Sequence, residues 1–253
     1  MISSYLVELL NKGRVFDLGQ LIFPGMPHHP NQPPFGYTLL KKHGDVTLGD
    51  RKVSFCNDIF MIGGHTGTHL DAVAHVACNN RVFGGVDITN LQDYQNGLKF
   101  MGIDTTSPIV KRGILLDIPR LFDIEVLDYN FGVGEKEIQQ ACQEEGVNIK
   151  KGDVVLIRTG WIKFWDDRRK YLSLDKGVPG VVEGGAQFLT SKCVSFTGTD
   201  TATYDKVPPH DLPCHVILLK ENGIQIMEML NLEELATNRI YEFLFIACLL
   251  YTS

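Results

Sequence analysis

Three histidines and one aspartate stand close together near residue 70. His65, His69 and His75 fall within one eleven-residue window, and Asp71 lies between the last two of them. Neutral imidazole and carboxylate are the usual nitrogen and oxygen ligands of zinc and related divalent ions. A single histidine is most often a core or surface residue, but four such side chains packed among glycines predict a metal site. Their spacing differs from the H-E-x-x-H pattern, so the cluster does not indicate a metalloprotease.

The backbone of this segment has to bend to bring the four side chains together. On one α-helix, Asp71 would point away from His65 and His69. On one strand, His65 and His69 would lie ~13 Å apart at ~3.3 Å per residue, too far for a single ion. Gly67 lies between them and permits a turn. We therefore predict a strand, a glycine turn and a short helix over residues 70–78, in which the aspartate and the last histidine face the same way.

Two further candidates lie far along the chain. His215 falls near the start of a predicted helix, and Glu228 lies within an apolar predicted strand. A carboxylate is costly to bury unless it is paired or bound to a metal. Each residue alone has an ordinary explanation, as a helix-end histidine or as the partner of a lysine or arginine. Together with the first cluster, they indicate a second half of the site.

The elements expected to position these residues alternate between apolar strands and helices. Residues 23–35 contain five prolines, which preclude a helix there. Gly146 is expected to end one of the helices as its C-cap. Strands are predicted at residues 53–62, 113–118, 153–159, 193–197 and 224–230, and helices at 4–12, 134–145, 181–191 and 213–221. This alternation predicts an α/β fold, and the lack of a linker or repeat predicts a single domain over residues 1–253.

The composition excludes several classes of protein. A net charge of −6 and a pI of ≈ 5.7 argue against nucleic acid or an anionic membrane as the main partner. The N-terminus does not have the pattern of a signal peptide, and no uninterrupted run of ~20 apolar residues predicts a membrane span. The six cysteines are scattered without a C-x-x-C pair, as free thiols in a reducing compartment would be. We therefore predict a cytoplasmic protein.

The histidine segment also resembles a known signature. Residues 65–75, His-Thr-Gly-Thr-His-Leu-Asp-Ala-Val-Ala-His, resemble the H-x-G-T-H-x-D-x-P-x-H motif of the metal-dependent cyclase superfamily, which includes bacterial kynurenine formamidases and isatin hydrolases. Other segments resemble the family's motifs in the same order: Val-Phe-Asp-Leu at 15–18, Pro-Gly-Met-Pro at 24–27, Arg-Gly-Ile-Leu-Leu-Asp at 112–117, Gly-Asp-Val-Val-Leu-Ile-Arg-Thr-Gly-Trp at 152–161, Gly-Thr-Asp-Thr-Ala-Thr-Tyr-Asp at 198–205, and the stretch from 215 to 232. The resemblance covers most of the chain.

This resemblance implies a fold, an assembly and a set of ligands. The fold would be a swivelling β/β/α-type domain with a mixed sheet, and the protein would be a homo-oligomer, a homodimer or a homotetramer. One or two zinc ions per subunit are expected, with manganese as the alternative. His75 would be the acid/base. The implied ligands are His65, His69 and Asp71 for the first ion, and Asp71, His215 and Glu228 for a second.

The chain departs from the family pattern at three places. Val73 stands where the motif has proline, which should disturb the turn little. One extra residue separates His215 from Glu228. His29 stands where kynurenine formamidases carry a substrate-contacting tryptophan, which weakens the match to an N-formylkynurenine substrate. By the same resemblance, substrate contacts are expected from His29, Phe35 and Thr203.

The end of the chain is a further difference from the family. Related sequences continue beyond the F-L-F-x-A segment with another strand, whereas this sequence ends at residue 253. We therefore expect a truncated C-terminus and an unpaired sheet edge, which would be an aggregation liability.

The predicted reaction follows from the parts of the site. A divalent ion lowers the pKa of bound water towards ~7 and polarises a carbonyl. His75 would take a proton from that water and pass one to the leaving nitrogen. No G-x-S-x-G elbow, P-loop or dinucleotide fingerprint is present. We therefore predict an arylformamidase-like hydrolase of a small amide. An isatin-type lactam hydrolase and a non-catalytic metal-binding scaffold are the alternatives, and the scaffold is disfavoured because it would not need His75.

Overall fold

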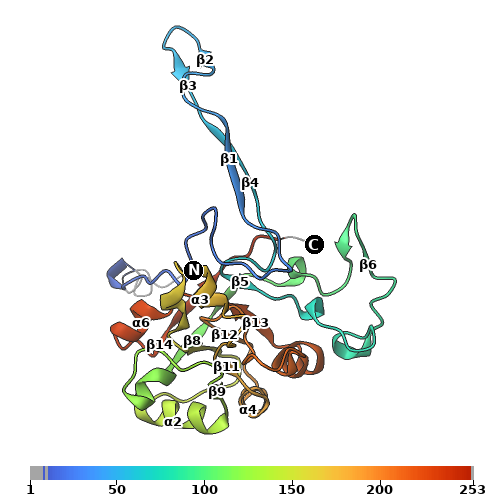
Figure 1. The fold of residues 1–253 in the computed structure, drawn as a ribbon, viewed down its shortest axis with the longest axis vertical. Helices are drawn as coiled ribbons and strands as arrows, with labels where there is room; N and C mark the ends of the chain where they lie inside the picture. The colour runs from blue at the N-terminus through green and yellow to red at the C-terminus, as the bar shows by residue number, and fades with distance from the viewer. Residues whose placement is uncertain (1–7, 9–10, 252–253) are drawn as a thin grey trace.

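The computed structural model describes residue 8 and residues 11–251. The helix predicted at residues 4–12 falls largely outside these described residues. The described part centres on a mixed sheet with helices on its faces, and a long hairpin projects from it (Figure 1). The predicted mixed α/β fold is therefore confirmed.

The central sheet has six strands within the described residues. In spatial order they are β14 (Glu242–Ala247), β8 (Ile109–Asp117), β10 (Val154–Arg158), β12 (Phe196–Thr199), β13 (Gln225–Glu228) and β5 (His69–Leu70). The four inner strands run parallel, and the two edge strands, β14 and β5, run antiparallel to their neighbours. The sheet therefore ends at β5, the strand that begins the second half of the histidine motif.

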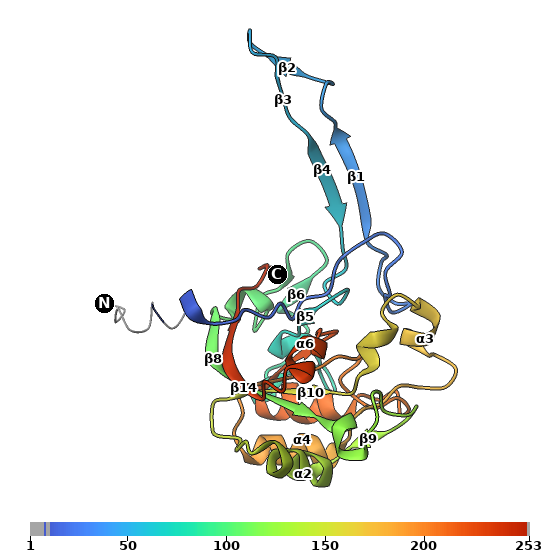
Figure 2. The ribbon, with the colours of Figure 1, turned by 90° about the vertical axis from the view of Figure 1, so that its left-hand side faces the viewer.

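Helices cover both faces of the sheet. On one face lie α2 (Glu135–Glu145), α4 (Glu183–Ser191) and the π-helix η6 (Val216–Glu221), which continues α5 (Pro213–His215). The other face is covered by α6 (Glu233–Thr237) and the segment around Phe16 and Leu18. Figure 2 shows α2 and α4 side by side beneath the sheet. The shorter elements are α3 (Arg168–Leu172), the strand pairs β9 (Gly132–Val133) with β11 (Gly180–Val181) and β6 (Gln92–Asp93) with β7 (Gly97–Leu98), and the 3₁₀ helices η1 (Val73–His75), η2 (Phe83–Gly85), η3 (Ile103–Thr105), η4 (Ile118–Phe122) and η5 (Trp161–Phe164).

The inner strands are apolar on both faces because both faces are buried. Along β8, Ile114 and Leu116 pack towards α2, whereas Leu115 packs towards α6. This alternation is the period of two expected of a strand. Burial on both sides explains why β8 and β10 appear in the sequence as continuous apolar runs.

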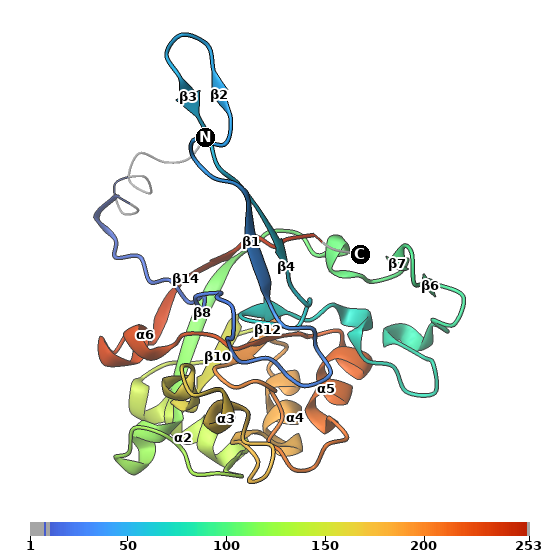
Figure 3. The same ribbon diagram turned by 45° about the horizontal axis from the view of Figure 1, so that its top comes forward.

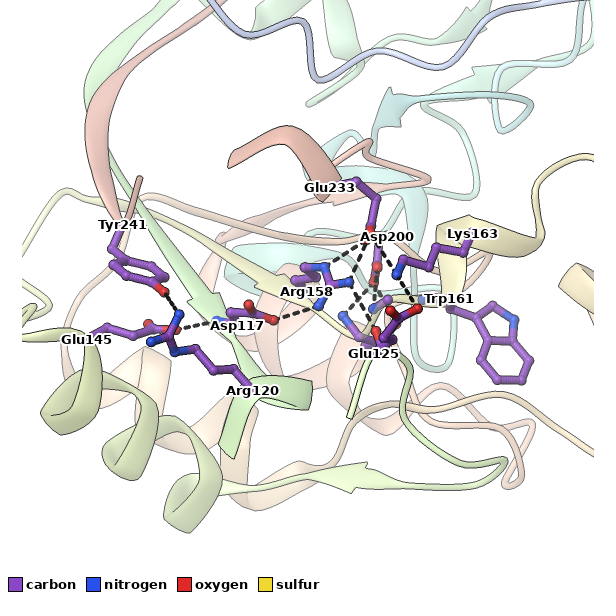
Figure 4. Close-up of polar contacts among 12 residues, drawn as sticks. Asp117, Arg120, Glu125, Glu145, Arg158, Trp161, Lys163, Asp200, Glu233 and Tyr241 are labelled. Carbon is purple, nitrogen blue, oxygen red and sulfur yellow. Dashed lines mark hydrogen bonds and ion pairs between the residues drawn. The ribbon is translucent and has the colours of Figure 1, made fainter. Parts of the chain in front are cut away.

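A polar frame joins the carboxyl ends of β8 and β10. Arg158 donates one hydrogen bond to Asp117 (2.7 Å) and two to the carboxylate of Glu233 (2.7 and 2.9 Å) (Figure 4). Each of the three nitrogen atoms of this buried guanidinium therefore donates to an acceptor, and Nη2 donates to the Glu125 carbonyl as well as to Glu233. Such pairing offsets the cost of burying the charge.

A two-stranded arm projects away from the sheet. It consists of β1 (Gly36–Lys41) paired antiparallel with β4 (Asn57–Met61), and of β2 (Thr47–Leu48) paired with β3 (Val53–Ser54) at its tip. Figures 1 and 3 show the arm extending well beyond the rest of the molecule. Its exposed apolar side chains are Tyr37, Leu39, Leu40, Leu48, Val53, Ile59, Phe60 and Met61.

Most predicted elements are present, with some shifts. The strands at 113–118, 153–159 and 224–230 and the helix at 134–145 are confirmed, and Gly146 ends that helix with a φ of 68°. The strand predicted at 193–197 is shifted, because Cys193 still belongs to the turn after α4 and β12 begins at residue 196. The helix predicted at 213–221 is present, but most of it is a π-helix.

All six cysteines are free. No helix among the described residues is long and apolar enough to cross a membrane.

Candidate metal centre

A glycine turn connects the first two histidines, as predicted. Gly67 has a φ of 73°, a left-handed conformation that glycine adopts without steric cost. Thr68 ties the turn to the end of β13 by donating a hydrogen bond to the Met229 carbonyl (2.6 Å). The turn reverses the chain so that Nδ1 of His65 lies 3.2 Å from Nε2 of His69.

The segment after the turn is a strand and not the predicted helix. His69 pairs directly with Glu228 in the antiparallel ladder of β5 with β13, and the Asp71 amide donates to the Ile226 carbonyl. Side chains two residues apart on a strand share a face, so His69 and Asp71 point the same way. The prediction of a helix over 70–78 is wrong, because pairing with β13 satisfies this backbone. The only helical part is η1, which ends at His75.

The distant candidate His215 also reaches the cluster. Its Nε2 lies 3.4 Å from Oδ2 of Asp71 and 3.3 Å from Oε1 of Glu228. The one-residue excess between His215 and Glu228 falls in a connection that contains the π-helix η6, a form that accommodates an extra residue within a helix. The longer spacing therefore does not displace His215 from the site.

The predicted ligands converge on Asp71. Nδ1 of His65 lies 2.9 Å and Nε2 of His69 lies 3.4 Å from Oδ1 of this aspartate. Two groups of three residues could each hold an ion, because the ligand atoms within each group all lie within 4.8 Å of one another. Both groups contain Asp71. Their members are His65, Asp71 and His75 in one group, and His69, Asp71 and Glu228 in the other.

Burial and charge shift the pKa values of these groups in opposite directions. Burial would raise the pKa of Asp71, but contacts with His215, His65 and His69 hold it well below its ordinary value. Burial lowers the pKa of His69, but the carboxylates of Asp71 and Glu228 outweigh it and raise the value to about 9. His75 is exposed at the cavity wall, yet desolvation by its surroundings outweighs the Asp71 carboxylate and lowers the pKa of His75. A neutral imidazole at this position can accept a proton at neutral pH.

The donor set fits a divalent cation. Both carboxylate oxygens of Asp71 are buried, and neither accepts a hydrogen bond of good geometry. The imidazole nitrogens of His65 and His69 face each other and this carboxylate. A divalent ion among them would accept these lone pairs, and nitrogen and oxygen donors of this kind suit zinc or manganese.

A large cavity opens onto the cluster. Its volume is ≈ 1080 Å³, and His65, His69 and His75 lie in its wall. The other walls come from the base of the arm, the β6–β7 hairpin and the residues after β14. The apolar side chains among them include Phe35, Phe60, Ile62, Leu98, Ile103 and Leu250.

The structure separates the three predicted substrate contacts. Phe35 lines the cavity, whereas His29 and Thr203 are not among the lining residues. His29 contacts the backbone amide of Asn31 through Nδ1 (3.2 Å), and Thr203 donates its hydroxyl to the Asp205 carbonyl (3.0 Å). Tyr204, the residue after Thr203, is fully buried in the core.

Sequence reasoning missed one residue that touches the site. Asp205 contacts Nδ1 of His215, on the ring edge opposite the cluster. It is the last residue of the Gly-Thr-Asp-Thr-Ala-Thr-Tyr-Asp segment, and its place in that segment was the only signal in the sequence.

Comparisons with known proteins agree with this fold. Residues 16–206 match the model of the Cyclase family, described as "Putative cyclase", so the chain belongs to this family. A kynurenine formamidase from Bacillus cereus is 22% identical over 223 residues, which cover 87% of this chain and 83% of that protein.

Two solved structures have the same fold. The crystal structure of a novel cyclase matches with a TM-score of 0.85 at 22% identity, covering 94% of this chain and 82% of the other. Isatin hydrolase A from Ralstonia solanacearum matches with a TM-score of 0.70 at 24% identity, covering 92% and 86%.

Proposed function

We propose that this protein is a metal-dependent hydrolase that cleaves an amide C–N bond in a small molecule. The observation that carries the proposal is the convergence of three histidines and Glu228 on Asp71 at the wall of a large cavity. The kynurenine formamidase and isatin hydrolase relatives support it, since their names describe cleavage of this class of bond.

The roles of the residues follow from their positions. We assign His65, His69, Asp71, His215 and Glu228 as ligands of one or two ions, with zinc expected and manganese as the alternative. A divalent ion there would polarise the substrate carbonyl and lower the pKa of water. His75 would accept a proton from the attacking water and donate it to the leaving nitrogen. Water adds across the C–N bond, so the products are a carboxylic acid and an amine.

The cavity favours a neutral, aromatic substrate. None of the described residues that line it is a lysine or an arginine. The one lining carboxylate, Asp93, is already paired with Lys99 and with Asn96. An α-amino-acid substrate such as N-formylkynurenine would bring a carboxylate that no lysine or arginine among these lining residues could pair with. This favours a neutral aryl formamide or an isatin-type lactam.

A hydrolysis screen tests this proposal. N-formylkynurenine, formanilide and isatin would be offered separately to the protein loaded with Zn²⁺ or with Mn²⁺. We expect turnover of formanilide or isatin to exceed that of N-formylkynurenine. Absence of C–N cleavage with every substrate and both metals would contradict the hydrolase assignment, and preference for N-formylkynurenine would contradict the neutral substrate.

The exposed arm supports the expected homo-oligomer. A two-stranded ribbon is at best marginally stable alone in water, yet this one exposes apolar side chains such as Leu40, Ile59 and Met61. In a symmetric dimer, the arm of each copy would cover these side chains of the other, so one interface would bury both sets. We therefore assign a homodimer that forms through the arm, with a homotetramer as the larger alternative. Each chain would form a single domain.

We also assign the protein to the cytoplasm. The six free cysteines support this assignment, because thiols stay reduced in that compartment.

A further inference from the structure

The loop that follows β12 contacts two of the candidate ligands. Residues 200–205 follow the carboxyl end of β12 and contact His215 and Glu228. The contacts come from two neighbouring positions, the backbone of Tyr204 and the side chain of Asp205. One short loop thus touches ligands that belong to a helix and to a strand.

Asp205 uses both of its carboxylate oxygens around His215. Oδ1 accepts a hydrogen bond from the Cys214 amide (2.6 Å), and Oδ2 contacts Nδ1 of the imidazole. An ionised carboxylate can only accept, so Nδ1 must carry the proton. The lone pair of Nε2 then faces Asp71 and Glu228. His69 is oriented similarly, because its Nδ1 lies 2.8 Å from the Gly67 carbonyl.

The neighbouring residue orients Glu228. The Tyr204 amide donates to Oε1 of Glu228 (2.7 Å), while Oε2 lies 3.4 Å from Nε2 of His69. A carboxylate fixed by one donor presents its other oxygen in a defined direction.

The loop itself is held at both ends. At its start, Asp200 accepts hydrogen bonds from the Thr159 amide (2.9 Å) and the Gly160 amide (2.7 Å) (Figure 4). Near its end, the buried Tyr204 hydroxyl contacts Thr197 in β12 (2.9 Å). These hydrogen bonds anchor the loop, and with it Asp205, to the sheet.

We propose that Asp205 is a positioning residue that fixes the tautomer and orientation of His215, so that Nε2 is presented to a divalent ion. This inference rests on the proposed metal centre. Partners of this kind typically change metal affinity 10–100-fold when they are removed.

The variant Asp205→Asn tests the inference. Its amide can still accept from Cys214, but its NH₂ group would then face Nδ1 and favour the tautomer with the proton on Nε2, which cannot bind metal. Chelator competition should show Zn²⁺ and Co²⁺ bound ~10–100-fold more weakly than in the parent, and the visible spectrum of the Co²⁺ form should change. Asp211→Asn removes the same charge from an exposed position nearby and should leave both readouts unchanged.

A double-mutant cycle separates positioning from general damage. If Asp205 acts through His215, Asp205→Asn should cause no further loss of affinity in a His215→Ala background. Parent affinity in Asp205→Asn, or a full additional loss in the double variant, overturns the inference while leaving the hydrolase proposal intact.

A measurement on the parent protein needs no variant at Asp205. In the zinc-loaded protein with ¹⁵N-labelled histidine, the signal lost in His215→Ala should show a protonated Nδ1 and a metal-bound Nε2. A proton on Nε2 would overturn the inference. A parent protein that binds no divalent ion would overturn the proposed function as well.

Discussion

Asp71 is the residue on which the whole site depends. Its carboxylate is buried, and its two oxygens face His65 and His69 on one side and His215 on the other. A single carboxylate with nitrogen donors on both sides can bind one ion or bridge two. The histidines around it are not equivalent, since His75 lies at the end of a 3₁₀ helix and has a lowered pKa, whereas His69 has a raised one.

Replacing His75 distinguishes a proton carrier from a ligand. We expect His75→Ala to keep its full metal content and to lose ~10²–10⁴-fold in kcat, the usual contribution of a general acid/base. Metal analysis and steady-state kinetics measure the two effects. The matched control is His210→Ala, an exposed histidine outside the cavity. Loss of metal together with activity would instead make His75 a ligand.

Replacing His69 should remove the metal itself, whereas replacing His75 should leave it bound. His69→Ala removes a donor that faces both Asp71 and Glu228, so we expect most of the bound metal to be lost and turnover to fall with it. Atomic absorption after gel filtration measures the retained metal, with His43→Ala on the arm as the control. Full metal content in the variant would contradict the ligand assignment.

At the scale of elements, the sequence predicted correctly those helices and strands whose signals lie in neighbouring residues, and it missed features that depend on contacts between distant residues. The strands β8 and β10 and the helix α2 were predicted from apolar runs and a glycine cap, which are properties of neighbouring residues. The extended form of β5 was missed, because its pairing with β13 joins residues far apart in the sequence. The cavity walls were missed for the same reason, since they come from separate stretches of chain.

The end of α2 carries an acid that opposes folding at high pH. Glu145 accepts a hydrogen bond from the Asp117 amide (2.8 Å), but its other oxygen is buried without a partner. Burial raises its pKa to about 8. The position is also unfavourable for a negative charge because the carboxyl end of a helix dipole is negative.

We therefore expect stability to fall as pH rises between about 5 and 8. In this window the unfolded chain has already released the Glu145 proton, whereas the folded chain still holds it, so unfolding becomes easier as pH rises. Glu145→Gln keeps the acceptor for Asp117 and should be more stable than the parent above pH 8, by ~1–2 kcal/mol after allowance for partial exposure. Urea unfolding at pH 5 and pH 8.5 measures this. An equal difference from the parent at both pH values would contradict the assignment.

At the scale of the whole molecule, the arm and the cavity are parts of one region. Phe60 in β4 lines the cavity, while its neighbours Ile59 and Met61 point to the other face of the ribbon, because side chains alternate along a strand. Ile59 and Met61 are 53% and 61% exposed, which leaves that face of the arm without cover in a single chain. A second copy packed on this face would hold the arm in place and, through Phe60, one wall of the cavity.

The double variant Ile59→Thr and Met61→Thr tests this arrangement. Threonine retains β-propensity, so the ribbon should still form, but the apolar face is lost. We expect the parent to sediment as a dimer and the variant to shift towards monomer, with an increase in KM because the Phe60 wall is no longer held. Thr38→Val, on the same face, adds apolar surface and should leave the dimer intact. A parent that remains monomeric at high concentration, or a variant that stays dimeric with an unchanged KM, would show that the arm does not support the cavity through a second copy.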